Sequence, residues 1–208
     1  MCGSELHALP EGVQRVSRFL QDAGHPHAPQ MLDGAARTAQ EAADQLSILV
    51  GQVAKSIIFK RRSDGAAVLV VASGDRRVDE KKVTQLVGKV GRADADFVKS
   101  STGFSIGGVS PVAHATKVVT LMDAELQRFE TVWAAAGHPH GVFPASPAQL
   151  QALTADLAQL KDEYEHAKAR AKANGTELPT PPEVGIDAKL EMLMTECDGH
   201  AETEDAEI

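Results

Sequence analysis

A lysine inside a short apolar segment is the first sign of chemistry in this sequence. Lys55 interrupts the segment from Val53 to Phe59, which is rich in β-branched residues and is predicted to form a strand. A buried ammonium group costs free energy unless its charged end reaches a cleft or a partner. Lys55 is therefore either a functional cation at a cleft or a lysine of an edge strand whose ammonium extends to solvent. The next residue, Ser56, points to the opposite side of a regular strand.

Two adjacent glycines, Gly107 and Gly108, lie in a glycine-rich segment that runs from Thr102 to Pro111. Glycine lets backbone N–H groups approach a ligand without obstruction by a side chain. Such N–H groups can polarise an ester carbonyl and stabilise the oxyanion that forms when water attacks it. The same pattern also fits a tight turn between core elements.

Two His-Pro-His tripeptides, 25–27 and 138–140, raise the question of a metal site. Alternate residues of a strand share a face, and imidazole is a good zinc ligand. However, the intervening prolines fit poorly in paired strands, and no Cys or carboxylate cluster is adjacent. We therefore predict no metal site and no cofactor. The sequence also contains no P-loop and no Ser-His-Asp signature.

The elements that must position these residues are helices interspersed among short strands. Apolar periodicity predicts helices over residues 11–23, 39–46, 79–87 and 93–101. Thr38 and Glu41 form a capping-box pattern at the start of the second. Strands are predicted over residues 53–59, 67–71, 117–122 and 131–135, the first two joined as a hairpin through a turn at Asp64-Gly65. Because helices and strands do not alternate regularly, the fold class is predicted as α+β.

The last quarter of the chain differs in composition and charge. The first 155 residues carry 16 Lys and Arg against 15 Asp and Glu, whereas residues 156–208 carry 5 against 14. Ser146-Pro147 predicts a helix start, and apolar residues then follow from Leu150 to Ala171 with the spacing of a coiled-coil seam. We predict one domain over residues 1–155, followed over residues 156–208 by a helical extension, a Pro-containing linker and an acidic tail. The seam is a candidate for homodimerisation.

The remaining composition indicates a protein of the cytoplasm without a membrane partner. The two cysteines, Cys2 and Cys197, are near opposite ends of the chain, which argues against a disulfide framework. No apolar run reaches the roughly 18 residues of a membrane span, and no signal-peptide pattern is present. The net charge of −8 belongs to the tail, so a local basic patch for RNA remains compatible with the first 155 residues.

Three segments, taken together and in order, resemble the YbaK/ProX family of aminoacyl-tRNA editing domains. They are Thr38–Ala43 with Gly51–Phe59, then Val68–Asp79, then Ser101–Pro111. The resemblance extends over about residues 11–153 and implies an α+β domain with a mixed sheet or a partly open barrel surrounded by helices. Family members are free-standing or inserted in prolyl-tRNA synthetases, and they hydrolyse the ester between a wrong amino acid and the terminal adenosine of tRNA. A synthetase pocket rejects a similar amino acid by only about 1–3 kcal/mol per methylene, so a second site must remove the errors.

The resemblance also implies a role for each residue of the candidate site. Lys55 would hold the phosphate or sugar of the terminal adenosine, and Gly107 and Gly108 of the family's GxxxP loop would bind the ester carbonyl. The predicted substrate-binding residues are Ser56, Val109, Ser110, Pro111, Ala135, Gly137 and His138. A cysteinyl-type relative carries serine at the position aligned with Ala135, and an alanyl-type relative carries histidine near this segment. The edited amino acid therefore stays open. His138 either positions substrate or water, or is a solvated histidine of a turn.

The predicted function is hydrolysis of mischarged aminoacyl-tRNA by a deacylase that acts in trans. Its expected partners are aminoacyl-tRNA and an aminoacyl-tRNA synthetase. The alternative is a non-catalytic module that binds aminoacyl-tRNA or a synthetase. The presence of both Lys55 and the Gly107–Pro111 loop favours the enzyme, because a module that only binds has less need of both.

Overall fold

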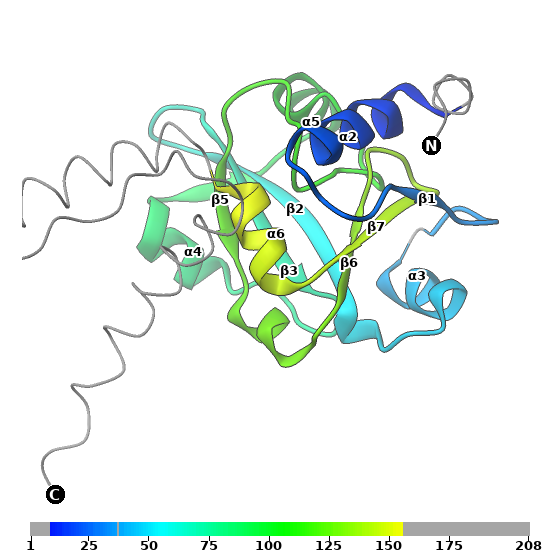
Figure 1. The fold of residues 1–208 in the computed structure, drawn as a ribbon. Helices are drawn as coiled ribbons and strands as arrows, with labels where there is room; N and C mark the ends of the chain where they lie inside the picture. Colours follow the sequence, from blue (N-terminus) through cyan, green and yellow to red (C-terminus); the bar gives the residue numbers. More distant parts are fainter. Residues whose placement is uncertain (1–8, 37, 156–208) are drawn as a thin grey trace, which may run out of the picture. The chain divides into compact units, whose positions relative to one another are not determined.

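The structure is a computed structural model, and it describes residues 9–36 and 38–155 (Figure 1). The chain divides into two units, Met1–Pro147 and Ala148–Ile208. Helix α6, Pro147–Thr154, begins where the predicted helix start lies. The rest of the predicted seam and the acidic tail lie outside the described residues, so homodimerisation and the boundary after residue 155 stay predictions. None of the helices in the described part of the chain is long and apolar enough to span a membrane.

The first unit is built on one mixed sheet (Figure 1). Its strands are β1 Gln30–Met31, β2 Val53–Arg61, β3 Ala67–Ser73, β4 Val90–Arg92, β5 Val119–Met122, β6 Val132–Ala135 and β7 Gly141–Ala145. Their order is β1-β7-β6-β2-β3-β5, with β4 paired to the far end of β2. The β2–β6 and β3–β5 pairs are parallel, and the other pairs are antiparallel. The predicted α+β class is confirmed. Of the two predicted arrangements, a mixed sheet or a partly open barrel, the structure has the mixed sheet, which is open.

Helices and 3-10 turns connect these strands. They are α2 Glu11–Asp22, α3 Ala39–Leu46, η1 Val50–Gln52, α4 Glu80–Val87, α5 Ala95–Thr102 and η2 Ala124–Arg128. The four predicted helices are confirmed, with ends shifted by no more than two residues. The Thr38 hydroxyl accepts a hydrogen bond from the Glu41 N–H at 3.1 Å, and Asp79 and Asp94 cap α4 and α5 in the same way. These caps satisfy N–H groups of the first turn that have no partner within the helix.

Three strands were missed by the sequence analysis: β1, β4 and β7. The first two are too short to show an alternating pattern. The third contains Pro144, which lies opposite Trp133 of β6, although proline usually argues against a paired strand. On its other side β7 pairs with β1 only at Gly141 and Val142. Pro144 therefore needs no N–H for a ladder on that side.

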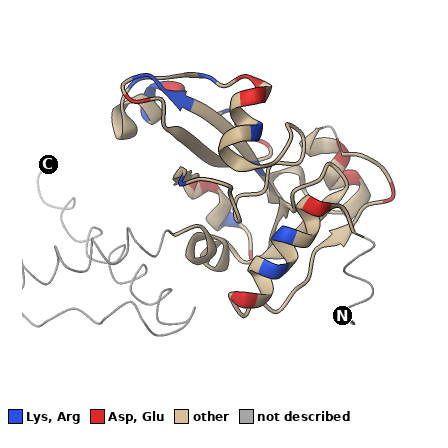
Figure 2. Ribbon diagram, turned by 90° about the horizontal axis from the view of Figure 1, so that it is seen from above, with Lys and Arg blue, Asp and Glu red and all other residues tan. Residues whose placement is uncertain are grey.

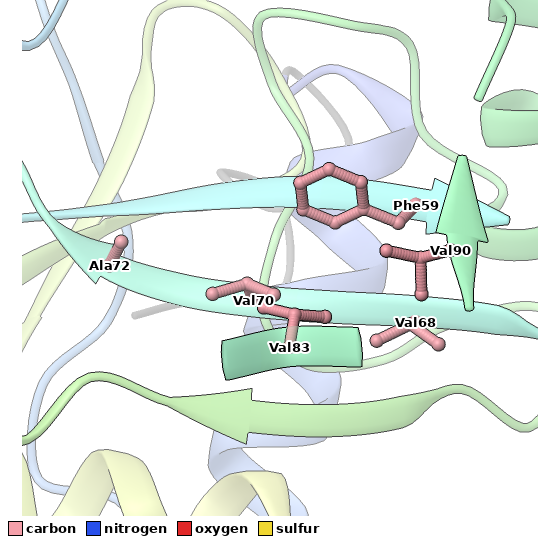
Figure 3. Packing of buried hydrophobic residues seen from close by; sticks show 6 residues of the cluster. All are labelled: Phe59, Val68, Val70, Ala72, Val83 and Val90. Carbon is pink, nitrogen blue, oxygen red and sulfur yellow. The ribbon is translucent and has the colours of Figure 1, made fainter. Parts of the chain in front are cut away.

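Strand β2 is central and is fixed along its length. On one face Phe59 packs with Val70 of β3 and Val83 of α4 (Figure 3). At its start, Val53 packs against Ala42 and Ala43 of α3. Because β2 has strands on both sides, the alternative that placed Lys55 on an edge strand is wrong.

Candidate active site

A cavity of about 260 Å³ lies where α3, the start of β2, β6 and the start of β7 meet the glycine-rich loop. Six of the ten predicted site residues line it: Lys55, Ser56, Gly107, Val109, Ala135 and His138. They come from segments far apart in the sequence. The other lining residues are mostly apolar: Ala36, Thr38, Ala39, Ala42, Leu46, Val53, Ala54, Trp133, Pro139, Gly141 and Val142.

The other four predicted residues, Gly108, Ser110, Pro111 and Gly137, are not among the lining residues. A methyl group on Gly108 would lie 2.6–2.8 Å from backbone atoms of His138. Gly137 has a φ of 84°, and a methyl group there would lie 2.6 Å from the Gly12 carbonyl oxygen and from the Phe104 ring. Ser110 and Pro111 are buried. The two glycines are therefore needed for close packing of the segments that carry the cavity wall.

The half-buried His114 contacts this loop at the Ser110 carbonyl group. Its Nε2 lies 2.8 Å from the Ser110 carbonyl oxygen, and its ring meets the Phe104 ring edge-on. Burial lowers the pKa of His114, partly offset by the hydrogen bond to Ser110 and reinforced by the charge of Arg15. A neutral His114 therefore supports the loop near neutral pH.

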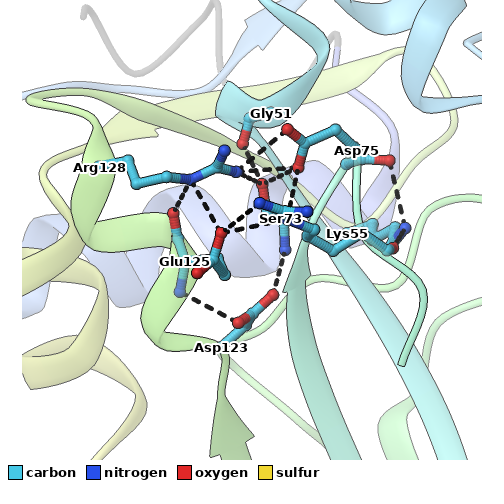
Figure 4. Close-up of polar contacts among 9 residues, drawn as sticks. Gly51, Lys55, Ser73, Asp75, Asp123, Glu125 and Arg128 are labelled. Atoms are coloured by element: carbon cyan, nitrogen blue, oxygen red, sulfur yellow. Dashed lines mark hydrogen bonds and ion pairs between the residues drawn. The ribbon is translucent and has the colours of Figure 1, made fainter. Parts of the chain in front are cut away.

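The Lys55 ammonium is held by backbone carbonyl groups of the loop that follows β3 (Figure 4). Its Nζ donates to the Gly74 carbonyl oxygen at 3.2 Å and to the Arg76 carbonyl oxygen. Burial lowers the pKa of Lys55, while the charges of Asp75 and Asp123 raise it. An ammonium group has three N–H donors, so one donor remains for a ligand in the cavity.

A charged network, which the sequence analysis did not predict, fixes the same loop (Figure 4). Arg128 of η2 donates to the two Asp75 carboxylate oxygens at 2.9 and 3.1 Å. Arg76 pairs with Glu125 of η2 at 2.8 Å. The hydrogen bonds from Arg128 and then Ser73 lower the pKa of Asp75, so this carboxylate is ionised at neutral pH.

Ser73, the last residue of β3, connects this network to that strand. Its backbone N–H donates to Asp123 at 3.2 Å, and its hydroxyl lies 2.7 Å from the Gly51 carbonyl oxygen and 2.8 Å from Asp75. The segment Ser73-Gly-Asp-Arg-Arg77 was visible in the sequence as part of a family motif, but it had no assigned role. Its charged partners Asp123, Glu125 and Arg128 lie about 50 residues further along the chain, beyond the reach of any local pattern.

The Ser56 hydroxyl is buried and has no hydrogen-bond partner among the described residues. Leaving such a group unsatisfied costs about 1–3 kcal/mol. Since Ser56 lines the cavity, a polar group of a bound ligand can supply the missing hydrogen bond. Lys55 and Ser56, consecutive residues at the start of β2, thus both contribute a polar group to the cavity lining.

The Gly107–Pro111 loop (the glycine loop) contributes backbone N–H donors. The Gly108 N–H donates to the Ser105 carbonyl oxygen at 3.1 Å and is therefore occupied. Within the described part of the chain, the N–H groups of Gly107 and Val109 have no protein acceptor. Both of these residues line the cavity.

His138 is held in one neutral form. Its Nδ1 accepts a hydrogen bond from the His140 N–H at 3.2 Å, so the proton of the neutral ring is on Nε2. Burial, and then the charge of His140, lowers the pKa of His138. His138 and Lys55 are the ionisable groups among the described lining residues, which include no carboxylate. At neutral pH His138 is thus a hydrogen-bond donor through Nε2.

The histidine pairs do not assemble with further ligands. The His25 and His27 rings are 5.8 Å apart, and the His138 and His140 rings are 5.2 Å apart. Across residues 9–36 and 38–155, no group of three His, Cys, Asp or Glu side chains is placed to hold a metal ion.

Fold and cavity together define a mixed α+β domain with a ligand site at the start of its central strand. Residues 33–153 match the family model of the aminoacyl-tRNA editing domain. The chain belongs to this family, which confirms the resemblance inferred from the three sequence segments.

Individual proteins and solved structures are also similar to this chain. The protein YwhH of Bacillus subtilis (strain 168) is 33% identical over 114 residues, which are 54% of this chain and 72% of that protein. A proline–tRNA ligase of Thermodesulfovibrio yellowstonii is 26% identical over 164 residues, which are 77% of this chain and 27% of that protein. A crystal structure described as "a putative trans-editing enzyme for prolyl tRNA synthetase" superimposes with a TM-score of 0.66 at 39% identity, covering 70% of this chain and 93% of that chain.

Proposed function

We propose that this chain is an aminoacyl-tRNA deacylase that hydrolyses the ester bond of mischarged aminoacyl-tRNA in trans. The observation that carries the proposal is that one cavity of an editing-domain chain is lined by Lys55, Ser56 and two loop residues, Gly107 and Val109, whose N–H groups have no acceptor among the described residues. These groups offer a cation, a hydroxyl and two amide donors. The aminoacylated terminal adenosine of tRNA presents matching partners: a phosphate, one free ribose hydroxyl and an ester carbonyl.

In this proposal Lys55 anchors the terminal adenosine. Two of its N–H donors are held by the Gly74 and Arg76 carbonyl groups, which fixes the direction of the third. Burial strengthens the attraction between the ammonium and a phosphate or sugar oxygen, because the effective dielectric constant is lower than in water. Ser56 supplies a hydrogen bond beside it.

The Gly107 and Val109 N–H groups bind the ester carbonyl. They are preorganised by the loop, so they stabilise the oxyanion of the tetrahedral intermediate without further rearrangement. Gly108 has a different role in this loop. Its own N–H is occupied by Ser105, and its missing side chain lets the loop lie against His138.

The attacking water transfers its proton to the substrate. Among the described lining residues, none is a carboxylate, and the Nδ1 of His138 is occupied by the His140 N–H. Water attacks the carbonyl carbon, the bond between that carbon and the ribose oxygen breaks, and the ribose oxygen takes up a proton. The products are the free amino acid and uncharged tRNA. His138 donates through Nε2 and orients the substrate or the water.

The direct test is release of labelled amino acid from a panel of mischarged tRNAs. We expect release well above spontaneous hydrolysis for at least one pair, which also identifies the edited amino acid. A chain that binds tRNA but releases no amino acid from any member of the panel would instead be the non-catalytic binding module.

A further inference from the structure

Three exposed cations lie at the far end of the β2–β3 hairpin, away from the cavity. They are Lys60 at the end of β2, Arg62 in the turn and Lys89 just before β4. The Arg62 N–H donates to the Lys89 carbonyl oxygen at 2.8 Å, which places these two residues side by side. Figure 2 shows basic positions gathered at this end of the hairpin. We call Lys60, Arg62 and Lys89 the hairpin cations.

These cations are not neutralised by neighbouring carboxylates. Among the described residues, none of the three forms an ion pair. The carboxylate of the turn, Asp64, is held by the Arg61 guanidinium at 2.9 and 2.6 Å. In a chain with a net charge of −8, the hairpin cations are thus a local positive surface.

Two of these three side chains, those of Lys60 and Arg62, lie against neighbouring residues. The Lys60 ammonium lies 5.0 Å from the centre of the Phe97 ring, which orients it by a cation–π interaction. A methyl group on Gly91 would lie 3.1 Å from the Arg62 guanidinium, so glycine leaves the room that this side chain occupies.

One cavity residue of β2, Ser56, lies on the face of the strand that carries Lys60. The pairing of β2 with β3 is regular from Ala54 to Lys60, so Ser56 and Lys60 share a face of the strand. Phe59 is on the opposite face, where it packs with Val83 of α4. At about 3.3 Å per residue, Lys60 is about 13 Å and Arg62 about 20 Å along the chain from Ser56.

We propose that the hairpin cations bind the phosphate backbone of the tRNA acceptor arm while the 3′ end occupies the cavity. This inference rests on the proposed function. Successive nucleotides of a stacked strand are about 3.4 Å apart, so distances of about 13–20 Å correspond to phosphates about four to six nucleotides from the ester. These phosphates lie at the junction between the unpaired 3′ end and the first base pairs of the arm. Contacts of this kind position the RNA without reading its sequence.

The test compares two triple variants that remove the same charge from opposite faces. The first is Lys60→Gln, Arg62→Gln and Lys89→Gln. The matched control is Lys81→Gln, Lys82→Gln and Arg92→Gln, since α4 and the side of β4 that carries Arg92 are on the Phe59 face. Thermal melting checks that both variants fold. Binding of uncharged tRNA is measured as a function of salt, and deacylation is measured on aminoacyl-tRNA and on an aminoacylated CCA trinucleotide.

In the hairpin variant, we expect the slope of log affinity against log salt concentration to decrease in magnitude by about two to three. Each lost phosphate contact contributes about 0.7–0.9 to this slope. Its kcat/KM should fall on aminoacyl-tRNA and stay within about twofold of wild type on the trinucleotide, which lacks the distant phosphates. The control should match wild type throughout.

A wild-type salt slope in the hairpin variant, or an equal loss of kcat/KM on tRNA and trinucleotide, would overturn the inference. Failure of the proposed function looks different. In that case the wild type hydrolyses neither ester, while the salt slope still separates the hairpin variant from its control and supports the surface.

Discussion

The lysine side of the cavity is Lys55 with the loop after β3, and the glycine side is the Gly107–Pro111 loop with the neighbouring Gly137. Different kinds of interaction hold these two sides. On the lysine side, charged pairs between partly exposed side chains fix the loop after β3: Asp75 with Arg128, and Arg76 with Glu125. On the glycine side, Gly108 and Gly137 are fixed by direct packing against backbone atoms of other segments.

This difference predicts different responses to mutation. An ion pair near the surface is weak and screened by solvent, so its loss loosens a loop more than it unfolds a domain. A packed interior has few voids, so a contact closer than 3 Å cannot accept even one methyl group without a shift of the backbone. We expect the lysine side to respond to charge and pH, and the glycine side to respond to volume.

The largest effect is expected from Lys55→Ala, which removes the ammonium group that the Gly74 and Arg76 carbonyl groups hold. We expect kcat/KM for deacylation to fall about 100-fold or more, the scale for loss of one preorganised donor. The melting temperature should change little, because the Nζ contacts only loop carbonyl groups. Lys55→Arg should also be poor, since a planar guanidinium does not replace a compact ammonium. Activity within twofold of wild type would contradict the assignment of Lys55.

A single methyl group tests the glycine side. Gly108→Ala places a methyl 2.6–2.8 Å from the His138 backbone, so the loop or the turn must move. We expect turnover to fall about tenfold and stability to fall by about 1–3 kcal/mol, as in overpacked cores. Gly34→Ala is the control, because its methyl would meet Gln45 at an ordinary 3.8 Å. Equal behaviour of the two variants would show that packing at Gly108 does not control the cavity.

Removal of one charged pair should have a smaller effect. Arg128→Ala frees Asp75 and loosens the loop whose carbonyl groups orient Lys55. We expect kcat/KM to fall about three- to tenfold, less than the about 100-fold that a full misplacement of a catalytic group costs. Arg128→Lys should recover part of the loss, since it keeps the charge, and steady-state kinetics with thermal melting separates this effect from unfolding. A large loss of stability without a change in kcat/KM would contradict a positioning role.

The smallest effect is a shift in pH dependence. Burial lowers the pKa of Lys55 below its ordinary value of 10.5, and the Asp75 charge partly opposes this. In the proposed function the ammonium form of Lys55 is required, so we expect activity to fall as the pH rises through the lowered pKa. Asp75→Asn removes a charge that raises this pKa, so the alkaline fall in kcat/KM should move to lower pH. The measurement is a pH–rate profile corrected for spontaneous ester hydrolysis.

Asp75 itself does not titrate in that range. Its pKa lies below the ordinary 3.8, so the stability from its ion pair is present above that value and is lost only as the pH falls through the lowered pKa. Asp22→Asn, which removes an exposed carboxylate from α2, is the control. An identical alkaline limb in wild type and Asp75→Asn would show that the network does not act on Lys55.

Local signals in the sequence were sufficient for the four helices α2 to α5 and for four of the seven strands in the described part of the chain. Thr38 with Glu41 marked the start of α3, and the β-branched residues after Val53 marked β2. These signals work because caps and alternating faces involve residues only two to four positions apart. They failed at β7, where Pro144 is tolerated because β1 covers only part of the strand.

Only the tertiary structure decided how the site is assembled. The sequence determined that Lys55 and the glycine loop are present, and the resemblance to the family implied a role for each. It could not show that Arg128 reaches Asp75, 53 residues earlier, or that Gly108 lies against the backbone of His138, 30 residues later. Both facts depend on where whole strands and loops lie in space. Burial, pKa and free hydrogen-bond donors are properties of that packing, and no short segment of the chain encodes them by itself.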